Sequence, residues 1–172
     1  NNPPDKSLKP IKLSNFEMHQ LAWPKQKVFD KKNNFAGFIM PKIRLDEAFT
    51  IEKLFSYKNR QKYNISEDIL WRITVCRNLA DLFFELHKNK YLVVDTKPAN
   101  ILIYKDKPAV CIIDCDGFKI INQPFKAEYI TPEYIAPETN KNDPSSISYE
   151  QDIFALSVIV DVWSLSVVLE LS

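Results

Sequence analysis

One stretch of this 172-residue chain constrains its fold more than any other: Tyr91 to Ile103, which reads YLVVDTKPANILI. Within it, Asp95, Lys97 and Asn100 stand in the order D-x-K-P-x-N, and an apolar strand follows at once. A single Asp or Asn beside a strand often only caps a turn. Three polar residues at this spacing, set against a strand, favour a site instead.

A second apolar run lies a short distance downstream. Residues 109–113 read AVCII, and Asp114 follows directly. The two apolar segments can pair as a hairpin through the polar turn at 104–108. Such a hairpin would bring Asn100 and Asp114 to the same edge.

A third motif, TPEYIAPE, occupies residues 131–138. Taken in this order, the three motifs resemble the catalytic loop, the metal-binding aspartate and the end of the activation segment of a eukaryotic-type protein kinase. Smaller pieces resemble the bacterial helix-hairpin-helix-associated branch of that superfamily: the D-x-D pattern at 114–116 and residues 2–4, 22–24, 37–41 and 77–80.

The resemblance implies catalytic roles for three residues. Phosphoryl transfer needs positioned charge and a positioned hydroxyl more than covalent chemistry. Asp95 would accept the proton of the substrate hydroxyl, and Lys97 would reach the transferring phosphate. Thr131 would bond to both of them, as the corresponding threonine does in Ser/Thr kinases.

The resemblance also implies ATP and Mg²⁺ as cofactors. Mg²⁺ prefers hard oxygen ligands and takes few of them from protein, so Asn100 and Asp114 are the expected pair, with Asp116 as the alternative to Asp114. Met40, Lys42 and Asn100 are the expected nucleotide-binding residues, because Lys42 would lie in the hinge at 41–43 that holds adenine and Met40 at the back of the adenine pocket. The alternative for Met40 is a plain core position.

Two departures from the family pattern leave a second function open. Val93 and Val94 stand where His-Arg is usual, so the receptor for an activation-loop phosphate is missing. The usual D-F-G is replaced by DCDGF at 114–118. The first hypothesis is a protein Ser/Thr kinase that moves the ATP γ-phosphate to a protein hydroxyl. The alternative is a catalytically impaired kinase-fold binding module.

Glycine is scarce: Gly37 and Gly117 are the only two. A kinase closes a glycine-rich loop over the phosphates, and neither glycine can supply one. We therefore expect a partial catalytic domain of α+β, protein-kinase-like fold that transfers no phosphoryl group by itself. Residues 1–45 would be a remnant of the small lobe, and residues 46–172 the large lobe through its central helix.

Composition narrows the partners. The net charge of +1 gives no global field toward nucleic acid or an anionic membrane. The three cysteines are odd in number and widely spaced, which indicates a reducing compartment. The polar N-terminal segment is no signal peptide. We expect a cytoplasmic protein whose partners are ATP and a protein substrate, without nucleic acid or membrane.

Periodicity predicts three further elements before the catalytic loop. A hairpin spans 27–40 with its turn at 30–34, and a short helix lies within 45–59. A long helix begins at Ser66 as N-cap and ends near Lys88. Its end carries His87, expected to be structural, and its inner face is expected to hold Ile69, Ile73, Cys76, Ala80 and Phe83.

The apolar run from Asp152 to Leu171 is predicted to be a core helix. By resemblance, Asp152 would bond to backbone amides of the catalytic loop. A membrane span is the competing interpretation of a run of this length, although Asp161 at its middle would be costly in lipid. The run also contains a near-repeat, 152–160 and 161–169, for which the sequence offers no physical reason.

Overall fold

The structure is a computed structural model that describes residues 12–15, 17–44, 46–122, 130–140, 142–143 and 146–168. The α-helices within these residues are α1 (Tyr57–Tyr63), α2 (Ile69–Lys88) and α3 (Tyr149–Val168). The strands are β1 (His19–Leu21), β2 (Gln26–Phe29), β3 (Phe35–Ile39), β4 (Ala48–Thr50), β5 (Tyr91–Leu92), β6 (Ile101–Tyr104), β7 (Val110–Ile112) and β8 (Lys119–Ile120). The mixture is α+β, as expected.

The main sheet has the strand order β1-β7-β6-β4. Strands β6 and β7 pair antiparallel, with Ile101 opposite Ile112, so the predicted hairpin is confirmed. The hydrogen bond from the Ile113 amide to the Asn100 carbonyl, 2.9 Å long, closes the open end of this hairpin. Asn100 and the residues after β7 therefore lie at one edge of the sheet.

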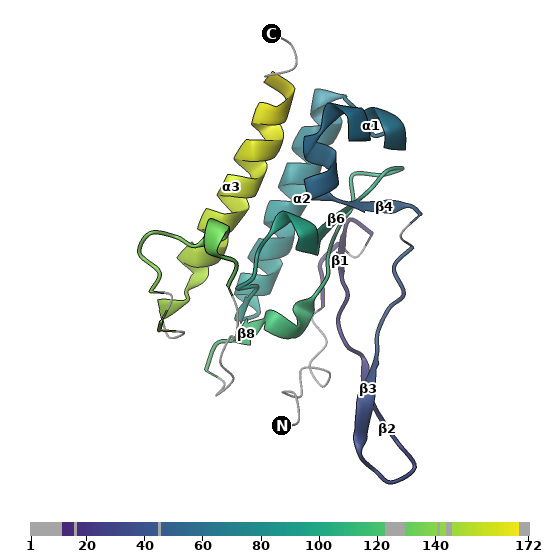
Figure 1. Cartoon of the computed structure of the whole chain (residues 1–172), viewed down its shortest axis with the longest axis vertical. Helices are drawn as coiled ribbons and strands as arrows, with labels where there is room; N and C mark the ends of the chain where they lie inside the picture. Colours follow the sequence, from purple (N-terminus) through teal and green to yellow (C-terminus); the bar gives the residue numbers. More distant parts are fainter. Residues whose placement is uncertain are drawn as a thin grey trace.

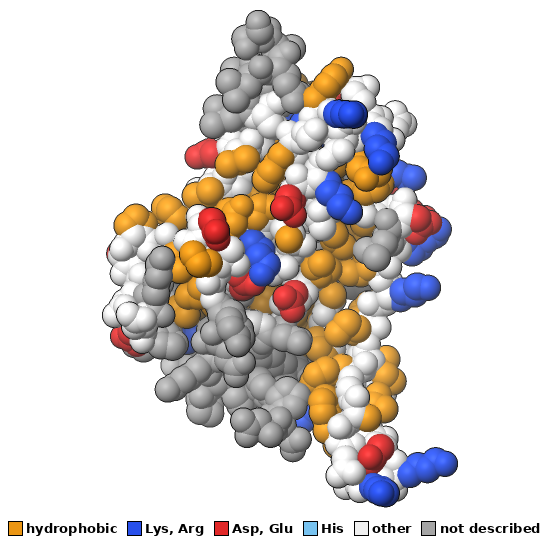
Figure 2. Space-filling view, in the orientation of Figure 1, with side chains coloured by type: hydrophobic (Ala, Val, Ile, Leu, Met, Phe, Trp, Pro, Cys, Tyr) orange, Lys and Arg blue, Asp and Glu red, His pale blue; other side chains and the backbone are white. Residues whose placement is uncertain are grey.

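The predicted hairpin near the N-terminus is also confirmed, as β2 paired antiparallel with β3. Its turn is stabilised by Asp30, whose side chain accepts bonds from the amides of Lys32 and Asn34. The hairpin projects from the rest of the molecule (Figure 1). Hydrophobic side chains cover much of its visible surface (Figure 2), and Phe29 and Ile39 are 51% and 52% exposed.

Helix α2 ends at Lys88 as predicted, but it begins later than predicted and buries a different face. Asp68, not Ser66, is the N-cap, and its side chain accepts a bond from the Leu70 amide. Ile69, Ile73 and Ala80 are exposed, so the predicted inner face is wrong at these positions. The face that is buried comprises Arg72, Val75, Asn78, Leu79, Leu82, Phe83 and Leu86.

The error has a physical cause in two polar residues. Periodicity assigns polar side chains to the solvent face, but Arg72 and Asn78 of α2 are buried with partners. Arg72 donates to the Trp163 carbonyl in α3 at 2.7 Å. Asn78 donates to the Pro108 carbonyl in the β6–β7 turn, also at 2.7 Å. Because both polar side chains have buried carbonyl partners, the face of α2 that contains them is the buried face, and it differs from the face that periodicity predicts.

The single short helix expected within 45–59 is instead two pieces: the 3-10 helix η2 (Ile51–Phe55) and α1. Ser56 separates them in an extended conformation with ψ of 126°. Helix α1 ends at Tyr63 and is capped by Asn64, whose φ of 53° is the left-handed conformation common after helix ends.

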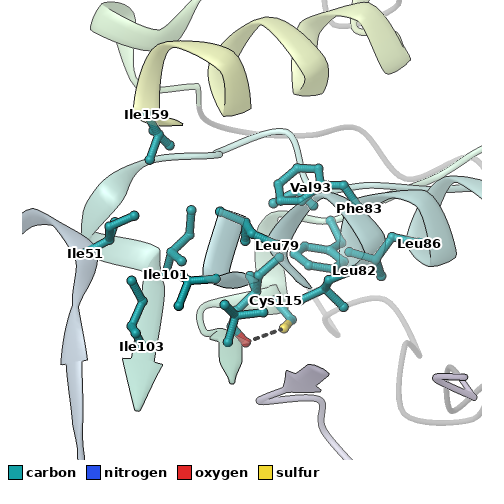
Figure 3. Packing of buried hydrophobic residues seen from close by; sticks show 14 of the residues in the cluster. Ile51, Leu79, Leu82, Phe83, Leu86, Val93, Ile101, Ile103, Cys115 and Ile159 are labelled. Atoms are coloured by element: carbon teal, nitrogen blue, oxygen red, sulfur yellow. Dashed lines mark hydrogen bonds between the residues drawn. The ribbon is translucent and has the colours of Figure 1, made fainter. Parts of the chain in front are cut away.

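Helices α2 and α3 lie side by side (Figure 1). They run antiparallel: Arg72 near the start of α2 bonds to the Trp163 carbonyl near the end of α3, and His87 at the end of α2 contacts Asp152 at the start of α3. Side chains from both helices and the sheet converge in one core (Figure 3), where Leu79, Ile101 and Ile159 are almost completely buried. Within the described residues, no helix has both the length and the apolar character needed to cross a membrane.

Candidate functional site

The segment that carries Asp95 is held from behind by the first turn of α3. The fully buried Asp152 accepts the amide of Val93 at 2.7 Å through Oδ2 and the amide of Val94 at 2.9 Å through Oδ1. The expected bonding of Asp152 to this loop is thus present. His87 at the end of α2 lies 3.0 Å from the same Oδ2 atom through its Nε2, which fits the expected structural role.

Val94 is held in an unusual backbone conformation by this arrangement. Its φ is 69°, a region that β-branched residues rarely adopt. The Asp95 amide donates to the Val93 carbonyl at 2.9 Å, so the chain turns sharply at Val94, directly before the Asp95 side chain. Backbone outliers of this kind concentrate at functional sites.

Asp95 collects three other predicted residues around it. Lys97 Nζ donates to its Oδ2 at 2.5 Å, and Thr131 donates to its Oδ1 through both Oγ1 at 2.5 Å and the backbone amide at 3.0 Å. Asn100 Nδ2 donates to the Asp95 carbonyl at 3.1 Å. Residues 36 positions apart in the sequence are therefore brought to one carboxylate.

These contacts also fix the charge of Asp95. Burial raises the pKa of the Asp95 carboxyl, but the hydrogen bonds from Lys97 and Thr131 and the charge of Lys97 together lower it more, so its pKa lies below the ordinary value. Asp95 is consequently a carboxylate at neutral pH. Chemically it can accept a hydrogen bond from a hydroxyl group and orient it.

The expected metal ligands lie close by in the fold. Because Asn100 uses its Nδ2 toward the Asp95 carbonyl, its Oδ1 is the atom left for a cation. Asp114 follows β7 and is exposed, with a φ of 61°. Among the described residues no group of three or more His, Cys, Asp or Glu could hold a metal. One amide and one carboxylate fit Mg²⁺, which keeps waters and phosphate oxygens as its other ligands.

The alternative ligand, Asp116, has a side chain outside the described part of the structure. Its neighbour Gly117 ends the 3-10 helix η4 (Cys115–Gly117). A Cβ atom placed on Gly117 would lie 3.9 Å from the Cβ of Asp95. The segment after Asp114 therefore runs directly beside the Cβ atom of Asp95, a proximity that the sequence did not predict.

The two expected hinge residues lie apart from this cluster in the chain. Met40 follows β3 and is 46% exposed, so the alternative that it is a core residue is wrong. Lys42 is exposed as well. The described hydrogen bonds and ion pairs link neither residue to Asp95 or Asn100, and their role toward a nucleotide stays a prediction.

Gln151 is the residue that sequence reasoning missed. It lies one position before Asp152 in α3, and its amide bonds to the backbone of the segment that follows Thr131. A polar residue directly before the expected Asp152, at the start of the apolar run, was the available signal.

Comparison with known proteins gives one family. The family model described as "Protein kinase domain" matches residues 26–170. A search among curated proteins finds no match.

Proposed function

The chain belongs to the protein kinase domain family, and we propose that it is part of a catalytic domain that transfers the γ-phosphoryl group of ATP to a serine or threonine hydroxyl of a protein substrate. One observation carries the proposal: Asp95 is kept as a carboxylate by Lys97 and Thr131, while Asn100 and Asp114 stand at the same edge of the sheet. Phosphoryl transfer needs a base near the acceptor hydroxyl, a positive side chain near the phosphate and oxygen ligands for Mg²⁺.

Each residue then has a defined task. Asp95 accepts the hydroxyl proton of the substrate and aims its oxygen. Lys97 keeps Asp95 ionised and offers its charge to the phosphate that moves. Asn100 and Asp114 hold Mg²⁺, which when bound neutralises phosphate charge.

Thr131 supports the choice of serine or threonine as acceptor. Its hydroxyl and amide both bond to Asp95, as expected from the resemblance to Ser/Thr kinases. We place the reaction in the cytoplasm, because the cysteines of the described residues form no disulfide and thiols persist in reducing compartments.

The alternative, a kinase-fold binding module, rests on Val93 and Val94 in place of His-Arg and on the altered D-F-G at 114–118, and the positions of the two glycines also favour it. Gly37 lies within β3 and Gly117 lies beside Asp95, so neither is available for a loop over the phosphates. A module of this kind would bind nucleotide or protein without turnover.

The test is an incubation of the full-length protein with Mg²⁺, γ-labelled ATP and a mixture of protein substrates. Acid hydrolysis of the products should release labelled phosphoserine or phosphothreonine. Label only on tyrosine would contradict the acceptor class. Binding of ATP by calorimetry without any label transfer would favour the binding module.

A further inference from the structure

The first turn of α3 carries two adjacent buried polar residues, Gln151 and Asp152, which are 1% and 0% exposed. Asp152 holds the backbone of Val93 and Val94, directly before Asp95. Gln151 holds a second segment: its Oε1 accepts the Ala136 amide at 2.9 Å, and its Nε2 donates to the Tyr134 carbonyl at 2.8 Å. One helical turn therefore hydrogen-bonds both backbone segments that meet at the site, residues 93–94 and residues 134–136.

One short turn links the backbone that Gln151 holds to Thr131. The 3-10 helix η5 (Pro132–Tyr134) begins directly after Thr131, and the Tyr134 amide donates to the Thr131 carbonyl at 3.1 Å. Pro132 fixes its own φ, which stiffens this turn. The position of Tyr134 thus determines where the Thr131 hydroxyl lies relative to Asp95.

The chemistry of Gln151 fits a positional task better than a packing task. An apolar side chain of the same length would fill the space without the cost of removing an amide from water. A glutamine with both amide groups bonded specifies one register of the segment that it touches. An apolar residue would leave the buried Ala136 amide without its partner.

We propose that Gln151 is a positioning residue for phosphoryl transfer, which acts by setting the 134–136 backbone so that Thr131 reaches Asp95. The proposal rests on the proposed function for its catalytic consequence. The placement of Thr131 by Gln151 can be measured without any activity.

The first test compares amide hydrogen exchange in the full-length wild type, Gln151→Met and Ile159→Val. Methionine matches glutamine in length and forms neither bond. Ile159 is fully buried in α3 two turns away and provides a matched core control. We expect Gln151→Met to lose protection at the Thr131 amide, which donates to Asp95, while Val93 and Val94 stay protected. Unchanged protection at Thr131, or equal loss in Ile159→Val, would overturn the proposal.

The second test measures transfer kinetics. In Gln151→Met we expect kcat to fall roughly 10- to 100-fold, as for a small misplacement of catalytic groups, with KM for ATP unchanged. In a Thr131→Val background, Gln151→Met should lower kcat by a smaller factor than in the wild type, because part of its effect passes through the Thr131 hydroxyl, which valine lacks. Additive losses would overturn the proposal.

Failure of the proposed function and failure of the variant to fold can each be told apart from failure of the positioning role. If the wild type transfers no phosphate, the proposed function fails, and the exchange result alone decides the positioning role. If Gln151→Met does not fold, Gln151→Asn replaces it, since the shorter amide cannot span both backbone partners. Full Thr131 protection in Gln151→Asn would then overturn the proposal.

Discussion

At the scale of single residues, the site depends on which oxygen atoms remain available. Asn100 spends its nitrogen on the Asp95 carbonyl, and Asp114 stands exposed after β7. Asn100 directly precedes β6 and Asp114 follows β7, so the pairing of these two strands, and not a variable loop, fixes the position of one residue relative to the other. This is why the metal assignment favours Asp114 over Asp116.

We expect Asp114→Ala to weaken Mg-ATP binding by roughly tenfold or more, at least ~1.4 kcal/mol, because one of the two protein ligands is lost. Asp116→Ala should have a smaller effect. Calorimetric titration of Mg-ATP into both variants of the full-length protein makes the comparison. A larger loss for Asp116→Ala would reverse the assignment.

His19 in β1 predicts a pH dependence of stability. It is 2% exposed and pairs by backbone with Val110. Burial lowers the pKa of His19, and the nearby charges of Asp81 and Glu85 raise it by less. Its folded pKa is thus below the unfolded value of 6.5. The unfolded chain then binds more protons at pH below that value, so stability falls as pH falls through it.

His19→Phe should remove this part of the pH dependence. Urea unfolding at several pH values between about 5 and 7.5 gives the free energy of unfolding for both proteins. The wild type should lose stability toward acid more steeply than His19→Phe. Equal slopes would show that His19 does not titrate on unfolding.

At the scale of elements, α3 is the support of the site. Its buried side contains Gln151, Asp152, Ala155, Ile159 and Trp163, and its exposed side contains Asp161. The same helix therefore packs in the core and holds the loop before Asp95. The near-repeat in its sequence does not produce equivalent surroundings, since Asp152 is buried and Asp161 is exposed.

Asp152→Asn should lower the free energy of unfolding by roughly 2 kcal/mol, because one buried backbone amide loses its acceptor. Asp161→Asn removes the same charge from the exposed side of the same helix and should change stability little. Chemical denaturation of the two variants tests this contrast. Similar losses in both would mean that the Val93 and Val94 bonds contribute nothing.

The elements show how far the sequence can be read. Both hairpins were predictable, because each has apolar strands around a polar turn. The bonds of Asp152, and those of Thr131 to Asp95, were predictable through the family resemblance, whereas the described bonds include none from Thr131 to Lys97. The buried face of α2 was not, because Arg72 and Asn78 are satisfied by carbonyls from distant segments. The parallel pairing of β1 with β7 was missed for the same reason: its partners are 91 positions apart.

At the scale of the whole molecule, the arrangement lacks a cover for phosphates within the residues described. Gly37 and Gly117, the only glycines of the chain, are both committed elsewhere. Positioning and charge stabilisation around the β- and γ-phosphates supply most of the catalysis in this reaction.

We therefore expect residues 1–172 alone to bind Mg-ATP weakly and to transfer no measurable phosphate. Calorimetry with Mg-ATP and a radiolabelled transfer assay on this chain form the test. Micromolar affinity together with turnover would mean that other residues of the chain take the place of the glycine-rich loop.

The central claim is that phosphoryl transfer depends on the carboxylate of Asp95. Its most direct test is the single-turnover rate of transfer by the full-length protein with ATP bound, compared between wild type, Asp95→Asn and Asp106→Asn. Asp106 lies exposed in the β6–β7 turn and controls for loss of charge. We predict that the single-turnover rate of Asp95→Asn is lower by a factor on the order of 10² to 10⁴, while its ATP affinity is retained. The rate of Asp106→Asn should match that of the wild type. An unchanged rate in Asp95→Asn would contradict the central claim.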